Sequence, residues 1–228
     1  EIRFGMGAVK GVGENAVNAL IEERKANGPF LNIFDLARRV NLRTVNRRSL
    51  EALAMAGAFD TFEGTHRAQY FQKENGDGQT FLEKVLKHAG DYQAQKSGLQ
   101  VSLFGGSSEA EMPEIKMPVC EPWSNLEQLK FEKEVTGFYM SGHPLDDYKY
   151  EIDAFCQHKV TDLREENIRN FLGQKLVLAG ILSAVNHRLS KQNKHFGTFT
   201  IEDWNDSVQL NMFSEDYLKN KHLLEEGI

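Results

Sequence analysis

A short glycine-containing turn near the start of the chain has residue types that suit phosphate binding. The run is Lys10-Gly11-Val12-Gly13, and patterns typical of helices lie on both sides of it. Glycine allows the positive backbone dihedral angles of a tight turn, and a turn without side chains lets amides at a helix N-terminus approach a phosphate. With the charge of Lys10, these four residues predict a helix-hairpin-helix that binds the backbone of duplex DNA without reading its bases. An ordinary tight turn between two helices is the alternative.

Arginines are concentrated shortly after this turn, although the chain as a whole has a formal net charge of −6. They are Arg38, Arg39, Arg43, Arg47 and Arg48. We expect Arg47 and Arg48 to add duplex-binding contacts beside the hairpin, because cations supply the sequence-independent part of DNA binding. The alternative is a solvated helix face on which Glu51 neutralises one of the two.

A third candidate is the pentapeptide Gln100-Val101-Ser102-Leu103-Phe104, which lies in a segment rich in glycine, serine and proline. Leaving Leu103 and Phe104 in water forgoes roughly 3–5 kcal/mol of burial. The pair therefore either packs onto its own domain or enters the pocket of a partner.

The last part of the chain changes character after Gly173. Residues 176–182 form a continuous apolar run, and residues 195–204 and 208–212 alternate, so we expect three strands followed by a helix over 214–226. This order is typical of the first part of an OB-fold β-barrel. The turn over 187–195 and the outward face of the second strand then predict a single-strand-binding surface of Arg188, Lys191, Lys194 and Thr198. The alternative is that Lys191 and Lys194 only keep a hairpin loop soluble and bind no nucleic acid.

Composition narrows the function further. The two cysteines, Cys120 and Cys156, are far apart in sequence and offer neither a disulfide framework nor paired metal spacing. We find no signal peptide and no apolar run that could span a bilayer, so we expect no membrane partner. No carboxylate cluster or other catalytic group stands out, so we expect neither a catalytic residue nor a metal site. Because the chain begins with Glu1 rather than Met, we expect it to be a piece of a longer protein.

The candidate sites are positioned by an expected α+β architecture. Residues 1–95 form a helical domain with a tandem helix-hairpin-helix, 96–124 a linker, 125–172 a helical connector and 173–228 an incomplete OB-fold. Helical spacing and capping residues predict helices over about 16–25, 32–40, 44–56, 66–74, 80–88 and 126–139.

Three runs in this order resemble one protein family. They are RFGMGAVKGVG at 3–13, LAMAGAFD at 53–60 and EKEVTGFYMSGHPL at 132–145. Together they are similar to the C-terminal region of the bacterial replicative DNA polymerase III alpha subunit, a C-family DNA polymerase. The resemblance covers essentially the whole chain, and the last run is highly specific.

The resemblance implies a role in chromosomal DNA replication, in the bacterial cytoplasm. Its partners would be double-stranded primer-template DNA, single-stranded DNA, the sliding clamp and other subunits of the replicative holoenzyme. The pentapeptide fits the family's clamp peptides, so Gln100 would bond at the rim of the clamp pocket, while Leu103 and Phe104 would fill it beside Ser102. The family's polymerase chemistry uses palm-domain aspartates with Mg ions. Neither the palm nor a matching carboxylate cluster is present here, so we expect this segment to be inactive alone and without a cofactor.

Other readings stay open from the residues alone. A DNA repair protein with a helix-hairpin-helix would place a catalytic carboxylate or lysine close behind the hairpin. An OB-fold RNA-binding module, as in a translation factor or synthetase, would leave the presence of the pentapeptide unexplained. A scaffold that binds only protein would bind no nucleic acid, and its response to salt would be flat.

Overall fold

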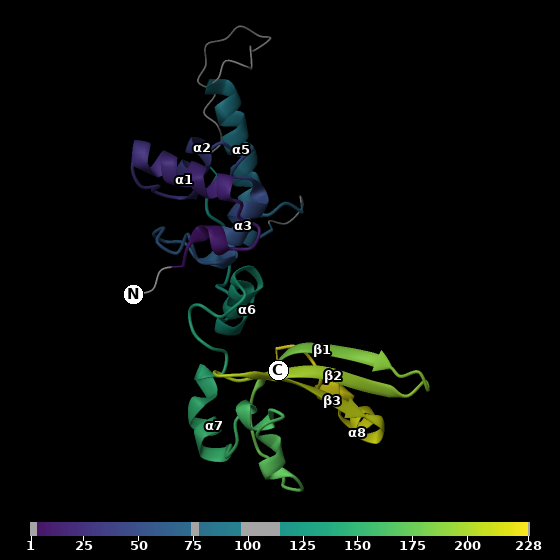
Figure 1. Ribbon diagram of the computed structural model, residues 1–228. Coiled ribbons are helices and arrows are strands. Elements are labelled where there is room, and N and C mark those ends of the chain that lie inside the picture. The colour runs from purple at the N-terminus through teal and green to yellow at the C-terminus, as the bar shows by residue number, and fades with distance from the viewer. Residues whose placement is uncertain (1–3, 74–77, 97–114, 228) are drawn as a thin grey trace. The chain divides into compact units, whose positions relative to one another are not determined.

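The computed structural model describes residues 4–73, 78–96 and 115–227. Within these ranges the chain contains eight α-helices and a three-stranded antiparallel sheet (Figure 1), which confirms the predicted α+β class. The chain divides into two compact units, Glu1–Ser141 and Gly142–Ile228, called here the helical unit and the C-terminal unit. The division falls inside the segment 125–172 that the sequence presents as one connector.

The helical unit is built from short helices that begin at polar capping residues. The Asn32 side chain accepts a hydrogen bond from the Asp35 amide, the Asn46 side chain accepts one from Ser49, and Ser124 forms a capping box with Glu127. The elements are η1 (Met6–Ala8), α1 (Glu14–Asn27), α2 (Ile33–Arg39), α3 (Arg47–Met55), α4 (Arg67–Phe71), α5 (Phe81–Lys96) and α6 (Asn125–Thr136). All six predicted helices are therefore present.

All six helices differ at their ends from the predicted bounds. α6 ends at Thr136 and not at residue 139, because Gly137 is its C-cap with a φ of +90°. α4 ends at Phe71 because Gln72 is extended and Lys73 forms a bridge with Thr80. α5 continues beyond residue 88 to Lys96, and its Gln93 side chain donates to the carbonyls of Ala37, Arg38 and Val40 at the end of α2. The carbonyls at the end of a helix have no partner within the helix, and Gln93 supplies them with a donor. The apolar spacing of α5 does not predict this contact with a distant segment.

One apolar core holds the helical unit together. It draws on the hairpin, on every long helix before residue 97 and on α6, through Val9, Val12, Ala16, Leu20, Ile33, Leu36, Leu50, Leu53, Tyr70, Phe81, Leu82, Val85 and Val135. The hairpin thus contributes buried side chains and is not an appendage of the core.

A buried ion pair joins α4 to α6. The Glu132 side chain is fully buried, and one of its oxygens lies 2.6 Å from Nη1 of Arg67. The Arg67 guanidinium also donates to Asp60, at 2.6 Å from Nη2, while the Glu132 carboxylate accepts from the Ser141 hydroxyl and from the amides of Met140 and Ser141. Both charged groups are satisfied several times over, which burial of an ion pair requires.

The C-terminal unit contains short helical elements before the sheet. They are η2 (Asp146–Tyr148), α7 (Lys149–Phe155), η3 (Val160–Leu163) and η4 (Ile168–Phe171). The sheet follows as β1 (Ile181–Leu189), β2 (His195–Glu202) and β3 (Ser207–Phe213), in the order β1-β2-β3 with antiparallel neighbours, and then α8 (Ser214–Asn220) and η5 (Lys221–Leu223). Three strands and a following helix are confirmed; that they form the first part of an incomplete OB-fold stays a prediction.

The predicted position of the first strand is wrong. The apolar run at 176–182 overlaps β1 only at Ile181 and Leu182, and the strand continues through polar residues to Leu189. Pairing with β2 decides this, because Ile181 lies opposite Glu202 and Leu189 opposite His195. The turn is consequently shorter than the predicted 187–195, and Arg188 lies on a strand. The predicted last helix is also shorter, since α8 ends at Asn220 and η5 follows it.

The buried pair predicts a pH-dependent stability of the helical unit. Burial acts to raise the pKa of Glu132, but hydrogen bonds from Ser141 and Arg67 outweigh it and hold the pKa below its ordinary value of 4.5. The pair therefore stabilises the fold above the unfolded-state pKa, and this contribution is lost as the pH falls through the lower folded-state pKa.

We expect Glu132→Ala to lower the free energy of unfolding by about 3–5 kcal/mol at neutral pH, because it leaves Arg67 buried with one partner fewer. Glu132→Gln should cost less, since its amide oxygen still accepts hydrogen bonds. Urea unfolding followed by far-ultraviolet circular dichroism would measure both, and the advantage of the wild type should shrink below about pH 4. Glu134→Gln, at an exposed position of the same helix, is the control. Equal stability of the Glu132 and Glu134 variants would contradict the role of the pair.

Candidate nucleic-acid interface

The glycine turn predicted to bind phosphate forms a tight connection between η1 and α1. Gly11 has a φ of +93°, which side-chain-bearing residues rarely adopt, and the Val12 amide donates to the Val9 carbonyl at 3.0 Å. Gly13 is the N-cap of α1, in extended backbone. The first amides of α1 have no acceptor within the helix, and the helix dipole places partial positive charge there. The turn thus ends at a helix terminus suited to an anion.

Two contacts from distant segments fix this turn. The Ser49 hydroxyl of α3 donates to the Gly11 carbonyl at 3.3 Å, and the Lys10 amide donates to the Val135 carbonyl of α6 at 2.7 Å. The sequence did not point to Ser49 or Val135, because their partners are far away along the chain. Pinning both sides of the turn pre-organises its amides, which lowers the entropy cost of binding.

The structure brings some of the predicted duplex-binding residues together. A side chain added at Gly11 would lie 3.5 Å from Nε of Arg48, so the Arg48 guanidinium lies beside the turn. Lys10 and Arg48 are exposed, whereas Val12 is buried in the core. Val12 can therefore offer a ligand only its backbone.

Arg47 is held differently from Arg48. Its guanidinium contacts two carboxylates, Glu51 at 2.7 Å and Glu83 of α5. The hydrogen bond with Glu51 raises the pKa of Arg47, as expected for a paired cation. Arg39 is likewise paired with Glu23 and Asp35, both at 2.9 Å. By contrast, no described residue forms an ion pair with Arg38, Arg43 or Arg48.

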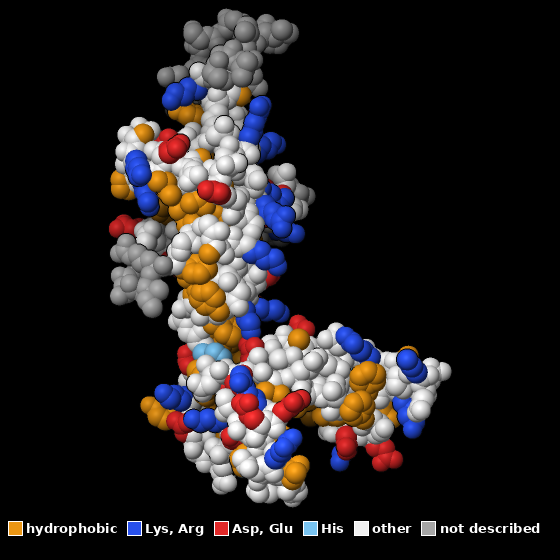
Figure 2. All heavy atoms as spheres, viewed as in Figure 1, with side chains coloured by type: hydrophobic (Ala, Val, Ile, Leu, Met, Phe, Trp, Pro, Cys, Tyr) orange, Lys and Arg blue, Asp and Glu red, His pale blue; other side chains and the backbone are white. Residues whose placement is uncertain are grey.

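The predicted single-strand surface is divided between a turn and two strands. Lys191 and Lys194 are exposed in the turn between β1 and β2, where the Ser190 hydroxyl accepts hydrogen bonds from the Gln192 and Lys194 amides. Figure 2 shows basic side chains gathered at this end of the sheet. Arg188 is exposed on β1. Thr198 is buried on β2, and its hydroxyl donates to Asn211 at 2.9 Å, so it supports the sheet surface from within.

The predicted clamp-binding residues Gln100, Ser102, Leu103 and Phe104 lie outside the described residues. Their role stays a prediction from the sequence.

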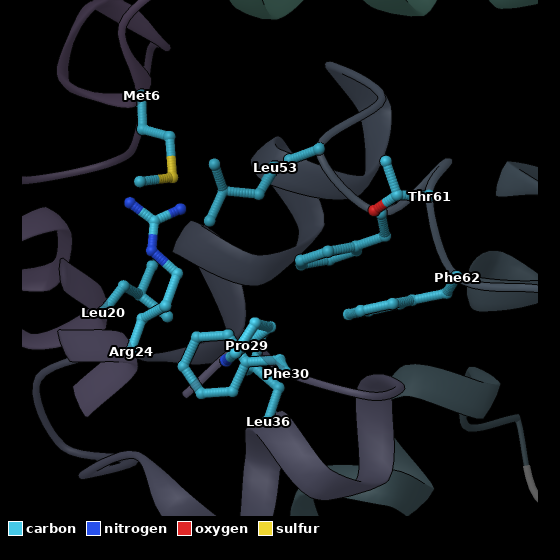
Figure 3. Close-up of a pocket in the computed structure, with 11 residues that line it drawn as sticks. Met6, Leu20, Arg24, Pro29, Phe30, Leu36, Leu53, Thr61 and Phe62 are labelled. Carbon is cyan, nitrogen blue, oxygen red and sulfur yellow. The ribbon is translucent and has the colours of Figure 1, made fainter. Parts of the chain in front are cut away.

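An apolar pocket of about 210 Å³ lies within the helical unit (Figure 3). Met6 of η1, Leu20 of α1 and Leu53 of α3 line it together with Phe30 and Phe62, and Arg24 is the one charged residue of the lining. This lining can accept an apolar group but offers no paired acid and base.

The described part of the chain contains neither a cluster of metal ligands nor a membrane-spanning helix. There, no three side chains of the kinds that bind metals lie close enough together to hold an ion. None of the helices in the described ranges has the length and apolar character needed to cross a membrane.

The family comparison identifies the class of the front part of the chain. A profile described as "Helix-hairpin-helix motif" matches residues 1–70, which include η1, the glycine turn and α1 to α3. The predicted helix-hairpin-helix is thereby confirmed.

Similar proteins then show which larger protein the chain resembles. It is 33% identical to the DNA polymerase III subunit alpha of Escherichia coli O157:H7 over 99% of its length, and 34% identical to that of Pasteurella multocida (strain Pm70) over 94%. The subunit of Treponema pallidum (strain Nichols) is 32% identical over 93%. The resemblance to the DNA polymerase III alpha subunit is confirmed. The chain spans only 17–18% of the length of these relatives.

The two glycines of the turn should respond differently to alanine. We expect Gly11→Ala to destabilise the helical unit by about 1–2 kcal/mol, because its positive φ strains any side chain. Gly13→Ala should cost less, about 0.5 kcal/mol, because alanine is a poorer N-cap than glycine, while the backbone is extended and nothing lies within 4 Å of an added Cβ. Urea unfolding of both variants would measure the difference. Equal destabilisation by the two would show that the turn conformation is not the one described.

Proposed function

We propose that this chain is the DNA-binding and clamp-tethering segment of a replicative DNA polymerase III alpha subunit. The observation that carries the proposal is the pinned glycine turn, where α1 begins beside the Arg48 guanidinium. It lies within the range matched by the helix-hairpin-helix profile, in a chain similar to that subunit along nearly its whole length.

The turn would bind duplex DNA through its backbone. Amides at the start of α1 would donate to a phosphate, while Arg48 and Lys10 would add positive charge on the exposed side. Contacts with phosphates carry no information about the bases, so binding would be independent of sequence. This suits a segment that must hold any primer-template.

Ion pairing decides which arginines are free to bind a DNA phosphate. Arg48 is unpaired among the described residues, so binding a phosphate displaces no carboxylate. Arg47 would first have to leave Glu51 and Glu83. We therefore assign the stronger role to Arg48 and a mainly structural one to Arg47.

This assignment can be tested by the salt dependence of duplex binding. Each lost phosphate contact lowers the slope of log K against log salt by about 0.9. We expect Arg48→Ala to lower the slope by about one such contact and to weaken binding equally for all sequences. Arg47→Ala is the matched control, a neighbouring residue of the same type with paired charge, and should leave the slope nearly unchanged. Unchanged binding by a folded Arg48 variant would contradict the proposal.

We place Gly13 at the same phosphate. We expect Gly13→Ala to weaken duplex binding, because its added methyl group crowds the helix terminus. Since the variant is expected to fold, this loss would report on the contact with DNA. Duplex affinity equal to wild type in this variant would leave the hairpin with a purely structural role.

The linker would tether the segment to the sliding clamp. In this proposal Leu103 and Phe104 enter a pocket on the clamp, and Gln100 with Ser102 bonds at its rim. Even a weak peptide contact keeps a polymerase at high effective concentration beside its primer end. In the same proposal the chain works with other holoenzyme subunits in the bacterial cytoplasm. The magnesium-dependent chemistry would take place in a palm domain elsewhere in the parent protein.

Double substitution tests the tether. Leu103→Ala with Phe104→Ala should abolish binding to the sliding clamp in surface plasmon resonance, because both anchoring side chains are removed. Duplex affinity should stay the same, since the glycine turn is untouched. Clamp binding that survives in the double variant would overturn this part of the proposal.

The C-terminal unit would bind single-stranded template. Support comes from the exposed Lys191 and Lys194 in an ordered turn and from Arg188 on the adjacent strand. A positively charged surface beside a sheet is the common way to follow a single strand.

A further inference from the structure

Three side chains form a row across the sheet near its basic end. Arg188 of β1 lies directly opposite Phe196 of β2, and Phe196 lies directly opposite Phe213 of β3. Directly opposed residues of antiparallel strands point to the same face. We call Arg188, Phe196 and Phe213 the aromatic row.

The aromatic row lies on the face of the sheet that α8 does not cover. An added Cβ at Gly197 would lie 2.9–3.0 Å from Leu224 and from Tyr217 of α8, so these residues cover the face of Gly197. Because successive side chains of a strand alternate, Phe196 points to the other face. Figure 1 shows α8 next to β2 and β3.

The two phenylalanines are stacked; Phe213 is exposed and Phe196 is half-buried. Their ring centroids are 5.5 Å apart with an interplanar angle of 24°, and the Phe213 residue is 58% exposed. Next to them on the same face, the bond between Thr198 and Asn211 ties β2 to β3. Two aromatic rings held on a paired sheet lose little conformational entropy when another ring stacks on them.

The end of the row at β1 and β2 is basic. Residues 186–201 contain Arg188, Lys191 and Lys194 but no aspartate or glutamate, in a chain with a net charge of −6. Glu215 and Asp216 follow Phe213 at the start of α8, so the positive charge lies toward the Arg188 end of the row. Exposed apolar rings beside cations would suit a ligand with flat π-faces joined by phosphates. A purely apolar partner would leave these three charges without a role.

We propose that the aromatic row is a base-stacking site for single-stranded DNA, with at least one base on Phe213 and the adjacent phosphates near Arg188 and Lys191. This inference rests on the proposed single-strand function of the C-terminal unit and assigns its contacts with bases. Neither phenylalanine was singled out from the sequence, because only the strand register places them together with Arg188.

The test compares two oligonucleotides of equal length, one of deoxythymidine and one abasic, binding to the whole 228-residue chain by fluorescence anisotropy. Phe213→Ala should weaken binding to the thymidine strand by about five- to a hundredfold, the range expected for one lost stacking contact. Binding to the abasic strand should not change, and Phe213→Trp should retain affinity. Arg188→Ala with Lys191→Ala should weaken both strands.

Leu218→Ala is the matched control, since Leu218 is an exposed apolar residue of α8 at 55%. It should bind both strands like the wild type. If wild type binds neither strand, the proposed single-strand function itself fails. If wild type binds both strands and Phe213→Ala binds thymidine equally well, the stacking site is refuted while the single-strand function stands.

Discussion

The helical unit depends on one buried ion pair, that of Arg67 with Glu132. A buried charge is tolerated only when its partners are present and well placed, so this pair fixes the segments that supply them. Asp60 comes from the run at 53–60, while Glu132, Met140 and Ser141 come from the run at 132–145. An added Cβ at Gly57 would collide with Nη2 of Arg67, so the guanidinium occupies space that only glycine leaves free. The second and third runs that carry the family resemblance therefore meet at one guanidinium.

The same helix that carries Glu132 also sets the glycine turn. Val135, one turn further along α6, accepts the hydrogen bond from the Lys10 amide. α6 thus connects the buried pair to the turn, the first of the three runs. Loss of the pair would shift α6 and thereby displace the turn. Our proposal gives neither charged group of the pair a contact with nucleic acid. Stability and binding are linked here by geometry, since a pre-organised turn needs a fixed support.

In the C-terminal unit the corresponding constraint is the strand register. A sheet has two faces, and a shift by one residue exchanges them. The observed register gives α8 the face of Gly197 and leaves Arg188, Phe196 and Phe213 together on the other. Our single-strand proposal depends on this separation between a covered face and an accessible one.

The sequence by itself determined the elements whose causes are local. Capping residues and apolar spacing located the helices, and the glycines of the turn predicted a helix-hairpin-helix that was confirmed. Only the tertiary structure decided that Arg47 is paired and Arg48 is not, that β1 extends to Leu189, and that Phe196 joins Phe213. Glu51 is a local partner that the sequence offers to either arginine, and the structure shows that it binds Arg47 together with Glu83 of α5, which is distant in sequence. The extent of β1 and the contact between the phenylalanines depend on how the strands pair, which the pattern of a single strand does not reveal.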